Sequence, residues 1–146
     1  MASTDPVRML VDRAAIHDLL MRYAHGVDRR DLDQVAACFS PDAGYEGSLG
    51  VGTIGIALEA LRERMSRYQV TMHFLGNQLI ELAGDTAHCE TYALVYHRLH
   101  AEEDAQDFIV GVRYLDRLAR HGEGWWIVHR TALMEFQRYD AVVLPP

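Results

Sequence analysis

Long apolar runs are absent from this chain of 146 residues. No stretch approaches the roughly 18 consecutive apolar residues that a membrane-spanning helix needs, so we expect no membrane association. Cysteine is scarce, and Cys38 and Cys89 are too few for a disulfide framework. The first residues lack both the basic and the apolar region of a secretory signal. Together these absences predict a cytoplasmic protein with reduced thiols.

A clustered basic face is also missing. The net charge is −7, and arginines are interspersed with acidic residues. This pattern argues against nucleic acid as a partner, because a phosphate backbone is bound by clustered positive charge. The chain has no nucleophile elbow, and its glycine-rich stretch at 47–52 follows no strand–helix phosphate pattern. His97 and His100 would point to opposite faces of a strand, which is poor metal-ligand geometry. We therefore expect no metal and no organic cofactor.

The first half of the chain carries helical patterns. Asp5-Pro6 is typical of a helix start, and apolar residues recur at close to helical spacing to about residue 28. Asp31-Leu32-Asp33-Gln34 indicates a capping box and a short second helix that extends through Phe39. A short strand at 43–47 and a glycine-rich turn region at 47–55 should follow. A third helix is expected at 56–67, with a buried face made by Ile56, Ala60, Leu61 and Met65.

Strand patterns fill the second half of the chain. Runs rich in Tyr, Val, Ile, Thr and Trp predict four strands, at residues 71–82, 86–100, 106–120 and 125–138. Their short connections, at 83–85, 102–104 and 122–124, require antiparallel neighbours. Helices followed by a meander predict one α+β domain over residues 1–146. We expect a strongly curved, mainly antiparallel sheet around the N-terminal helices, which is a cone-shaped α+β barrel with an internal pocket.

Two titratable residues that are distant in the sequence lie where a predicted helix ends and where a predicted strand begins. Asp28 ends the first predicted helix, and His73 lies near the start of the first long strand. Histidine can take or give a proton near neutrality, and an aspartate that accepts its other ring N–H fixes the tautomer. Inside one pocket, the two would form a proton-transfer pair. The alternatives are a helix-end aspartate bonded to nearby backbone or arginines, and a satisfied core histidine.

Three stretches stand at key points in this order of elements: Arg22-Tyr23 with Asp28, His73-Phe74-Leu75-Gly76-Asn77, and Arg113-Tyr114-Leu115-Asp116-Arg117. With these stretches, the chain resembles the nuclear transport factor 2-like superfamily. The chain is similar to the branch with SnoaL-like polyketide cyclases, scytalone dehydratase, bile acid 7α-dehydratase and hexachlorocyclohexane dehydrochlorinase. This resemblance implies that Asp28 and His73 form the catalytic pair. It also implies that Tyr23, five residues before the aspartate, donates a hydrogen bond to a carbonyl or a leaving oxygen.

Tyr23 and Asp28 raise a question of helix geometry. Residues five apart on an ideal helix lie about 140° apart. The two side chains would therefore share a face only if the last turn loosens, and Gly26 makes this possible.

The remaining pocket residues depend on strand register. A three-residue turn at 83–85 would pair His73 with Val95 and bring His97 to the same face, whereas a two-residue turn would reverse the parity. The resemblance favours the first arrangement. On that basis, the residues expected to line the pocket and bind substrate are His97, Tyr114, His129 and Thr131. Arg130 would instead be a structural ion-pair partner within the sheet.

The sequence thus favours a cofactor-independent lyase, a dehydratase or related elimination enzyme. The substrate class implied by the resemblance is a small, apolar, cyclic organic molecule. An isomerase or polyketide-type cyclase with the same pocket would share the first proton transfer. A different possibility is a non-catalytic ligand-binding or oligomerisation module. Because relatives are often homo-oligomers, we expect a homodimer or homotrimer, with Trp125 and Ile127 on the contact face.

Overall fold

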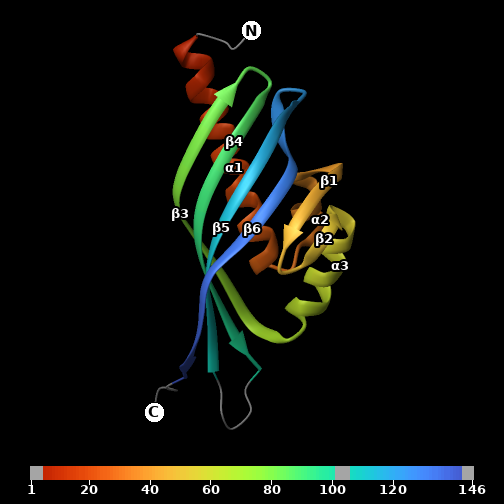
Figure 1. Cartoon of the computed structure of the whole chain (residues 1–146), viewed down its shortest axis with the longest axis vertical. Coiled ribbons are helices and arrows are strands. Elements are labelled where there is room, and N and C mark those ends of the chain that lie inside the picture. Colours follow the sequence, from red (N-terminus) through yellow and green to blue (C-terminus); the bar gives the residue numbers. More distant parts are fainter. Residues whose placement is uncertain (1–4, 101–105, 143–146) are drawn as a thin grey trace.

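The computed structural model describes residues 5–100 and 106–142. The helices in these ranges are α1 (Pro6–Asp28), α2 (Leu32–Ala37) and α3 (Ile54–Met65). The strands are β1 (Phe39–Gly47), β2 (Gly50–Thr53), β3 (Tyr68–Ala83), β4 (Thr86–Leu99), β5 (Gln106–His121) and β6 (Gly124–Ala141). Figure 1 shows the long strands side by side, with α1 behind them and α3 beside β1 and β2. None of the helices in the described ranges has the length and apolar character needed to cross a membrane.

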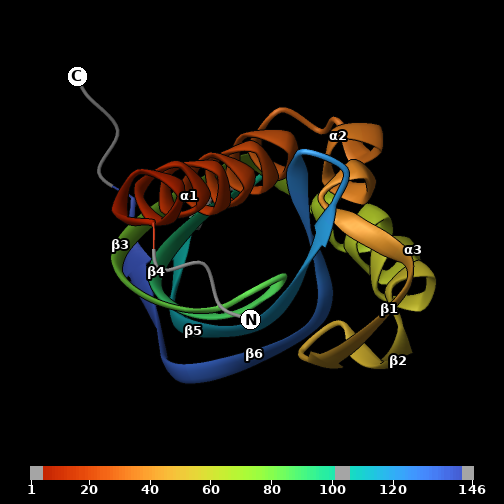
Figure 2. The ribbon, with the colours of Figure 1, turned by 90° about the horizontal axis from the view of Figure 1, so that it is seen from above.

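The strands form one six-stranded sheet in the order β2-β1-β6-β5-β4-β3. Neighbouring strands are antiparallel except for β1 and β6, which run parallel. The sheet curls without closing, and α1 lies across its concave side (Figure 2). We call this side the inner face and the opposite side the outer face. The predicted α+β class, with helices packed in a curved, mainly antiparallel sheet, is confirmed.

The middle of the chain departs from the predicted boundaries. Helix α2 ends at Ala37, and β1 begins at Phe39. The chain pairs with the backbone of β6 at this point, where Ile127 N donates a hydrogen bond to Cys38 O at 3.0 Å. The glycine-rich region contains β2 as well as turns. Helix α3 starts two residues earlier than predicted. Leu61 and Met65 lie on its buried face as predicted, but Ile56 does not. Ile56 is 55% exposed, whereas the buried residues are Ile54, Ala57, Leu61 and Met65.

The register between β3 and β4 decides which residues share the inner face. The predicted three-residue turn is wrong, because Ala83 pairs with Thr86 and only two residues form the turn. Nevertheless His73 does pair with Val95, because the register shifts between Leu75 and Gln78. This irregularity adds one residue on β3 and compensates for the shorter turn. The predicted turn at 102–104 lies outside the described residues.

The two faces of the sheet separate the core from the surface. Trp125 and Ile127 are 4% and 0% exposed and belong to the core. The prediction that they form an oligomer contact face is therefore wrong. The alternation along β6 and the bulges in it turn these side chains inward. The outer face instead exposes large apolar residues of other strands and of a later part of β6, and they include Met72, Phe74, Leu94 and Phe136.

A partly buried ion pair fixes the first half of α1 to the sheet. Asp12 accepts hydrogen bonds from Arg120 Nη1 and Nη2 at 3.0 and 2.9 Å, and from Trp125 Nε1 at 3.2 Å. The hydrogen bonds from Arg120 lower the pKa of Asp12, against the opposing effect of burial, with help from the Trp125 hydrogen bond. The charged carboxylate is therefore the form that the fold stabilises.

We expect Asp12→Asn to lower the free energy of unfolding by about 2 kcal/mol at pH 7, because hydrogen bonds to charged groups are lost. A group with a lowered folded pKa contributes stability above its unfolded pKa of roughly 3.9 and loses it as pH falls through the folded value. Urea unfolding at pH 7 and pH 3 should therefore show a smaller gap between wild type and variant at pH 3. Asp18→Asn, on the exposed face of α1, is the control. A gap that is equal at both pH values would contradict this account.

Candidate functional site

Asp28 and His73 meet on the inner face of the sheet. Asp28 Oδ1 lies 2.7 Å from His73 Nδ1, and Asp28 Oδ2 accepts the backbone N–H of His73 at 2.8 Å. The Asp28 side chain is 23% exposed and that of His73 is 8% exposed. Burial works to raise the pKa of Asp28, but the hydrogen bonds from the ring and backbone of His73 outweigh it, so the pKa is lowered. Asp28 is thus a carboxylate at neutral pH.

The tautomer of the neutral His73 ring follows from this contact. A carboxylate only accepts hydrogen bonds, so Nδ1 carries a hydrogen, and in the neutral ring Nε2 then carries the lone pair. No hydrogen bond to Nε2 occurs within the described residues, and Nε2 is not among the polar atoms sealed from solvent without a partner. The arrangement therefore presents a basic nitrogen that is held in one tautomer by a partly buried carboxylate.

The end of α1 positions this carboxylate. Arg30 N donates to Val27 O at 3.1 Å and Asp31 N to Gly26 O at 2.8 Å, which is the Schellman pattern. Arg30 occupies the left-handed position with φ of 63°, where glycine is usual.

The Arg30 side chain explains why arginine is present there. Its guanidinium donates to Thr71 Oγ1 at 2.8 Å and to Tyr68 O at 3.1 Å. Thr71 Oγ1 in turn donates to Asp28 Oδ1 at 3.2 Å. The helix end is thus tied to β3 beside the Asp28–His73 pair. The alternative in which Asp28 is bonded to Arg29 or Arg30 is not what the structure shows.

Tyr23 reaches the pair without any loosening of the helix. Helix α1 continues to Asp28, and the Tyr23 ring lies edge-on to the His73 ring at 6.3 Å between centroids. Gly26 has a packing role instead, because an added Cβ would lie 2.9 Å from Val35 Cγ2. The long side chain of Tyr23 bridges the angular separation of about 140° between positions 23 and 28 on the helix.

Arg130 lies behind Tyr23 and is fully buried. Its guanidinium donates to Asp116 Oδ1 and Oδ2 at 2.7 and 2.8 Å, which confirms its predicted structural ion pair. The guanidinium carbon lies 4.1 Å from the Tyr23 ring centroid and 4.2 Å from that of Tyr114. Arg130 Nη1 is buried without a hydrogen-bond partner in the described part of the chain. A positive charge thus lies between the two phenol rings, and burial raises the pKa of Tyr114 well above its usual range.

His97 also lies on the inner face, as predicted. Together with Val95, the cross-strand partner of His73, it lines a cavity of about 80 Å³. Tyr114 is buried beside Tyr23 rather than at this cavity, with 5.9 Å between the ring centroids. Two of the predicted pocket residues therefore share a face with Asp28 and His73.

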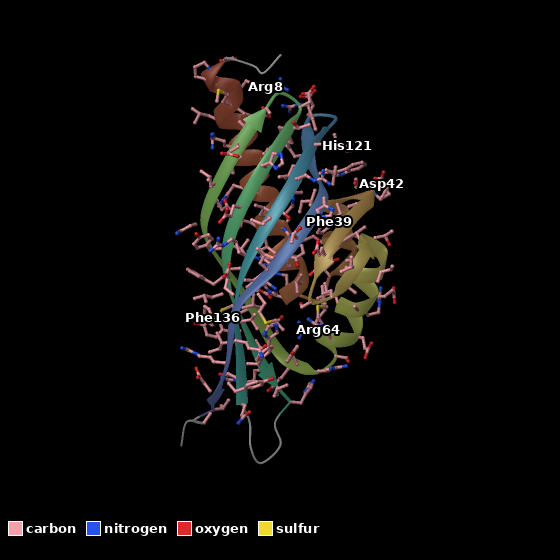
Figure 3. All side chains as sticks on the ribbon, viewed as in Figure 1. Arg8, Phe39, Asp42, Arg64, His121 and Phe136 are labelled. Atoms are coloured by element: carbon pink, nitrogen blue, oxygen red, sulfur yellow. The ribbon has the colours of Figure 1, made fainter. Side chains whose placement is uncertain are left out.

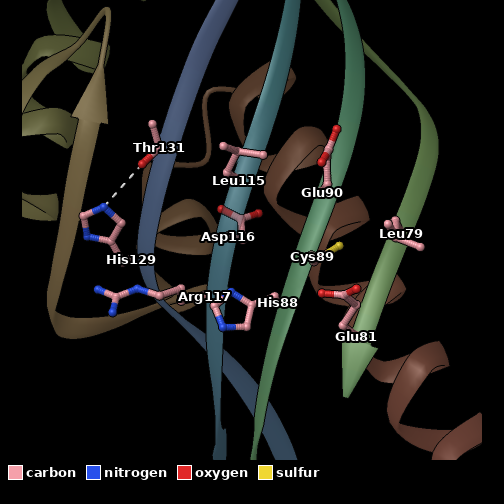
Figure 4. Close-up of a pocket in the computed structure, with 10 residues that line it drawn as sticks. All are labelled: Leu79, Glu81, His88, Cys89, Glu90, Leu115, Asp116, Arg117, His129 and Thr131. Atoms are coloured by element: carbon pink, nitrogen blue, oxygen red, sulfur yellow. Dashed lines mark hydrogen bonds between the residues drawn. The ribbon is translucent and has the colours of Figure 1, made fainter. Parts of the chain in front are cut away.

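The prediction that His129 and Thr131 line the same pocket is wrong. Side chains alternate along β6, so Arg130 points inward and its two neighbours point outward. Both residues line a groove of about 380 Å³ on the outer face (Figure 4). In that groove, Thr131 Oγ1 and His129 Nε2 are 3.4 Å apart. The groove is larger than the inner cavity, but it lies on the opposite side of the sheet from the Asp28–His73 pair.

Metal-binding and thiol chemistry have little support in the described residues. No three histidine, cysteine, aspartate or glutamate side chains within residues 5–100 and 106–142 converge as metal ligands. Cys38 and Cys89 are buried and free, and burial raises the pKa of both thiols. Both side chains belong to the hydrophobic core. Thr71 and Arg30 hold Asp28 through contacts that the sequence does not reveal, since neither residue is distinctive by type or spacing.

Similar proteins place the chain in a family. A model of the SnoaL-like domain matches residues 8–131. An uncharacterized protein of Mycobacterium tuberculosis strain H37Rv is 29% identical over 137 residues, covering 90% of this chain and 91% of that protein. A type 2 hexachlorocyclohexane dehydrochlorinase structure has a TM-score of 0.83 at 23% identity, covering 97% of this chain and 99% of that chain.

Two structures from Novosphingobium aromaticivorans have a similar fold. A proposed scytalone dehydratase has a TM-score of 0.83 at 20% identity, covering 92% of this chain and 91% of that chain. A proposed aromatic ring hydroxylase has a TM-score of 0.75 at 28% identity, covering 91% and 94%. The structures that are less than 25% identical to this chain support the assignment of the fold alone. Because the family model spans most of the sequence, the chain belongs to the SnoaL-like domain family of the nuclear transport factor 2-like superfamily.

Proposed function

We propose that the protein is a cofactor-independent lyase that eliminates water or a related leaving group from a small, largely apolar, cyclic molecule. The observation that carries this proposal is the 2.7 Å contact between Asp28 Oδ1 and His73 Nδ1, with Nε2 left as a base. The elimination chemistry is favoured by the likeness to the dehydrochlorinase and the proposed scytalone dehydratase. The catalytic roles of the individual residues belong to the proposal.

In the proposed reaction, His73 Nε2 takes a proton from a carbon next to an electron-withdrawing group. The C–H electrons form the new double bond, and the leaving group departs with its bonding electrons from the neighbouring carbon. The imidazolium that forms is stabilised by the carboxylate of Asp28. A departing hydroxyl takes up the proton that His73 carries, so it leaves as water and His73 returns to its neutral form. Tyr23 donates a hydrogen bond to the oxygen on which negative charge develops, and the buried charge of Arg130 lies against its ring.

The base can be tested without knowledge of the natural substrate. The probe is 5-nitrobenzisoxazole, whose ring opens to a coloured phenolate when a base removes its carbon-bound proton. We expect the wild-type protein to accelerate ring opening over buffer. His73→Gln should remove at least about 100-fold of that acceleration, the lower range for a positioned general base. The measurement is the initial rate of phenolate absorbance at pH 7.

The matched control is His129→Gln, because His129 lies on the outer face of the same sheet. This variant should keep the wild-type rate. Equal rates in His73→Gln and His129→Gln would show that the effect is not specific to His73 and would contradict its role as the base. If the wild-type protein gives no acceleration, the non-catalytic ligand-binding alternative becomes the better description. An isomerase or cyclase with the same base would also open the probe. Cyclic β-hydroxy ketones distinguish these activities from a lyase, because only a lyase converts them to the unsaturated ketone and water.

A further inference from the structure

His97 is a second histidine on the same face as His73. His73 pairs with Val95 across the two strands, and His97 follows Val95 by two residues, so the two rings lie diagonally from each other. The His97 ring packs between Tyr68 and Phe108, with centroid separations of 4.5 and 5.4 Å. Aromatic contacts on both sides hold its orientation.

The backbone of β5 fixes the tautomer of His97. Its Nδ1 lies 3.1 Å from Phe108 O. A carbonyl oxygen only accepts hydrogen bonds, so Nδ1 must donate and Nε2 must carry the lone pair. Burial lowers the pKa of His97 to about 4, although the Phe108 hydrogen bond works in the opposite direction. At neutral pH the ring is therefore uncharged, and its Nε2 only accepts hydrogen bonds.

The rest of the cavity is poorly suited to meet this acceptor. Apart from His97, its polar residues are Ser48 and Arg64. Arg64, labelled on α3 in Figure 3, donates to Ser48 Oγ at 2.9 Å and to Ser48 O at 2.6 Å, so its guanidinium is held at Ser48 rather than at His97. The other lining residues are apolar or aromatic, namely Val95, Phe108, Val110, Val112, Ala132 and Met134. No hydrogen bond to His97 Nε2 occurs within the described ranges of the chain.

The positive charge of Arg64 limits which ligand groups can donate a hydrogen bond to His97 Nε2. Arg64 lines the same cavity, and a ligand ammonium there would be repelled by its guanidinium. A neutral hydroxyl avoids this repulsion and satisfies the acceptor. An apolar or ether-bearing ligand would bury Nε2 without a partner, which is unfavourable.

We infer that His97 recognises a hydroxyl group on the ring of the substrate, and that this hydroxyl is not the leaving group. The inference deepens the proposed function, on which it rests, because it names a substrate feature for the same inner face. The hydroxyl donates its hydrogen to His97 Nε2. An imidazole with no proton on Nε2 cannot give one to a departing oxygen from that atom, so the recognised hydroxyl remains on the product.

The test compares the binding of phenol and anisole, which differ in the hydrogen that His97 would accept. NMR titration at pH 7 should show that the wild-type protein binds phenol about fivefold more tightly than anisole, the effect of one net hydrogen bond. His97→Phe keeps an aromatic ring in the stack but has no acceptor, so the two ligands should bind it equally. His97→Gln offers an amide oxygen and should restore part of the preference. His129→Phe, on the outer face, should keep the full preference.

Equal binding of phenol and anisole to the wild-type protein would overturn the inference, as would an unchanged preference in His97→Phe. Failure to bind either ligand at millimolar concentration would also overturn it. The result is separable from the test of the proposed function, because binding is measured without turnover. A hydroxyl preference in a protein that does not open 5-nitrobenzisoxazole would leave His97 as a recognition residue and remove only the lyase activity.

Discussion

Asp116→Asn is expected to lower the free energy of unfolding by about 3–5 kcal/mol, the usual cost of breaking a buried ion pair from one side. The side chains of Asp116 and Arg130 are 0% and 1% exposed. Burial works against the charged guanidinium of Arg130, but the charge and hydrogen bonds of Asp116 outweigh it and raise the pKa of Arg130. An amide at position 116 would leave that charge buried and uncompensated. Urea unfolding followed by circular dichroism measures the loss.

The chain contains a matched control for this experiment. Arg98 and Asp107 are also directly opposite each other on neighbouring strands, with both contacts at 2.8 Å. Their side chains are 45% and 24% exposed, so the geometry is alike while the burial differs. Asp107→Asn should cost less than about 1 kcal/mol. If Asp116→Asn and Asp107→Asn lower the free energy of unfolding by similar amounts, burial does not explain the contribution of the Asp116–Arg130 pair.

Asp28→Asn should reduce the rate of 5-nitrobenzisoxazole opening by about 100-fold to 10,000-fold. The carboxylate accepts hydrogen bonds from both the backbone N–H and Nδ1 of His73. An asparagine side chain has one acceptor oxygen and one NH2 group, and the backbone N–H can only donate. The oxygen is therefore expected to face the backbone, so the NH2 faces Nδ1 and moves the ring hydrogen to Nε2. The base is then lost although the side chains remain the same size.

Nitrogen-15 NMR of the imidazole distinguishes this cause from unfolding. The wild-type His73 ring should show a protonated Nδ1 and an unprotonated Nε2, and Asp28→Asn should reverse them. Thr71→Val removes the donor to Asp28 Oδ1 and the acceptor for Arg30, but it leaves both contacts between Asp28 and His73, so its His73 should keep the wild-type tautomer. If Asp28→Asn leaves both the tautomer and the rate unchanged, Asp28 only anchors the backbone of β3.

Periodicity revealed most of the fold, because apolar spacing distinguishes a helix from a strand over many residues. The β3–β4 hairpin shows its limit. The correct pairing of His73 with Val95 was predicted from a turn length that the structure does not have, and a register shift between Leu75 and Gln78 made up the difference. One added residue changes no local pattern, so the sequence cannot place it.

The candidate site shows a similar division. Asp28, His73 and Tyr23 could be identified because the resemblance supplied their positions, and the structure brings them together. His129 and Thr131 could not be placed by the same reasoning, because a single step along β6 reverses the face. Residues such as Arg30 act through tertiary contacts that no local spacing reveals.

The parallel pairing of β1 with β6 has a consequence for folding. Phe39 is paired with Ile127, although nearly the whole sheet lies between them in sequence. Such non-local contacts carry a large entropic cost of loop closure and slow the folding reaction. During synthesis, β1 and β2 must wait for β6 to emerge before they can join the remaining strands. Until then their backbone edge is open to other chains, so this junction is where aggregation competes with folding.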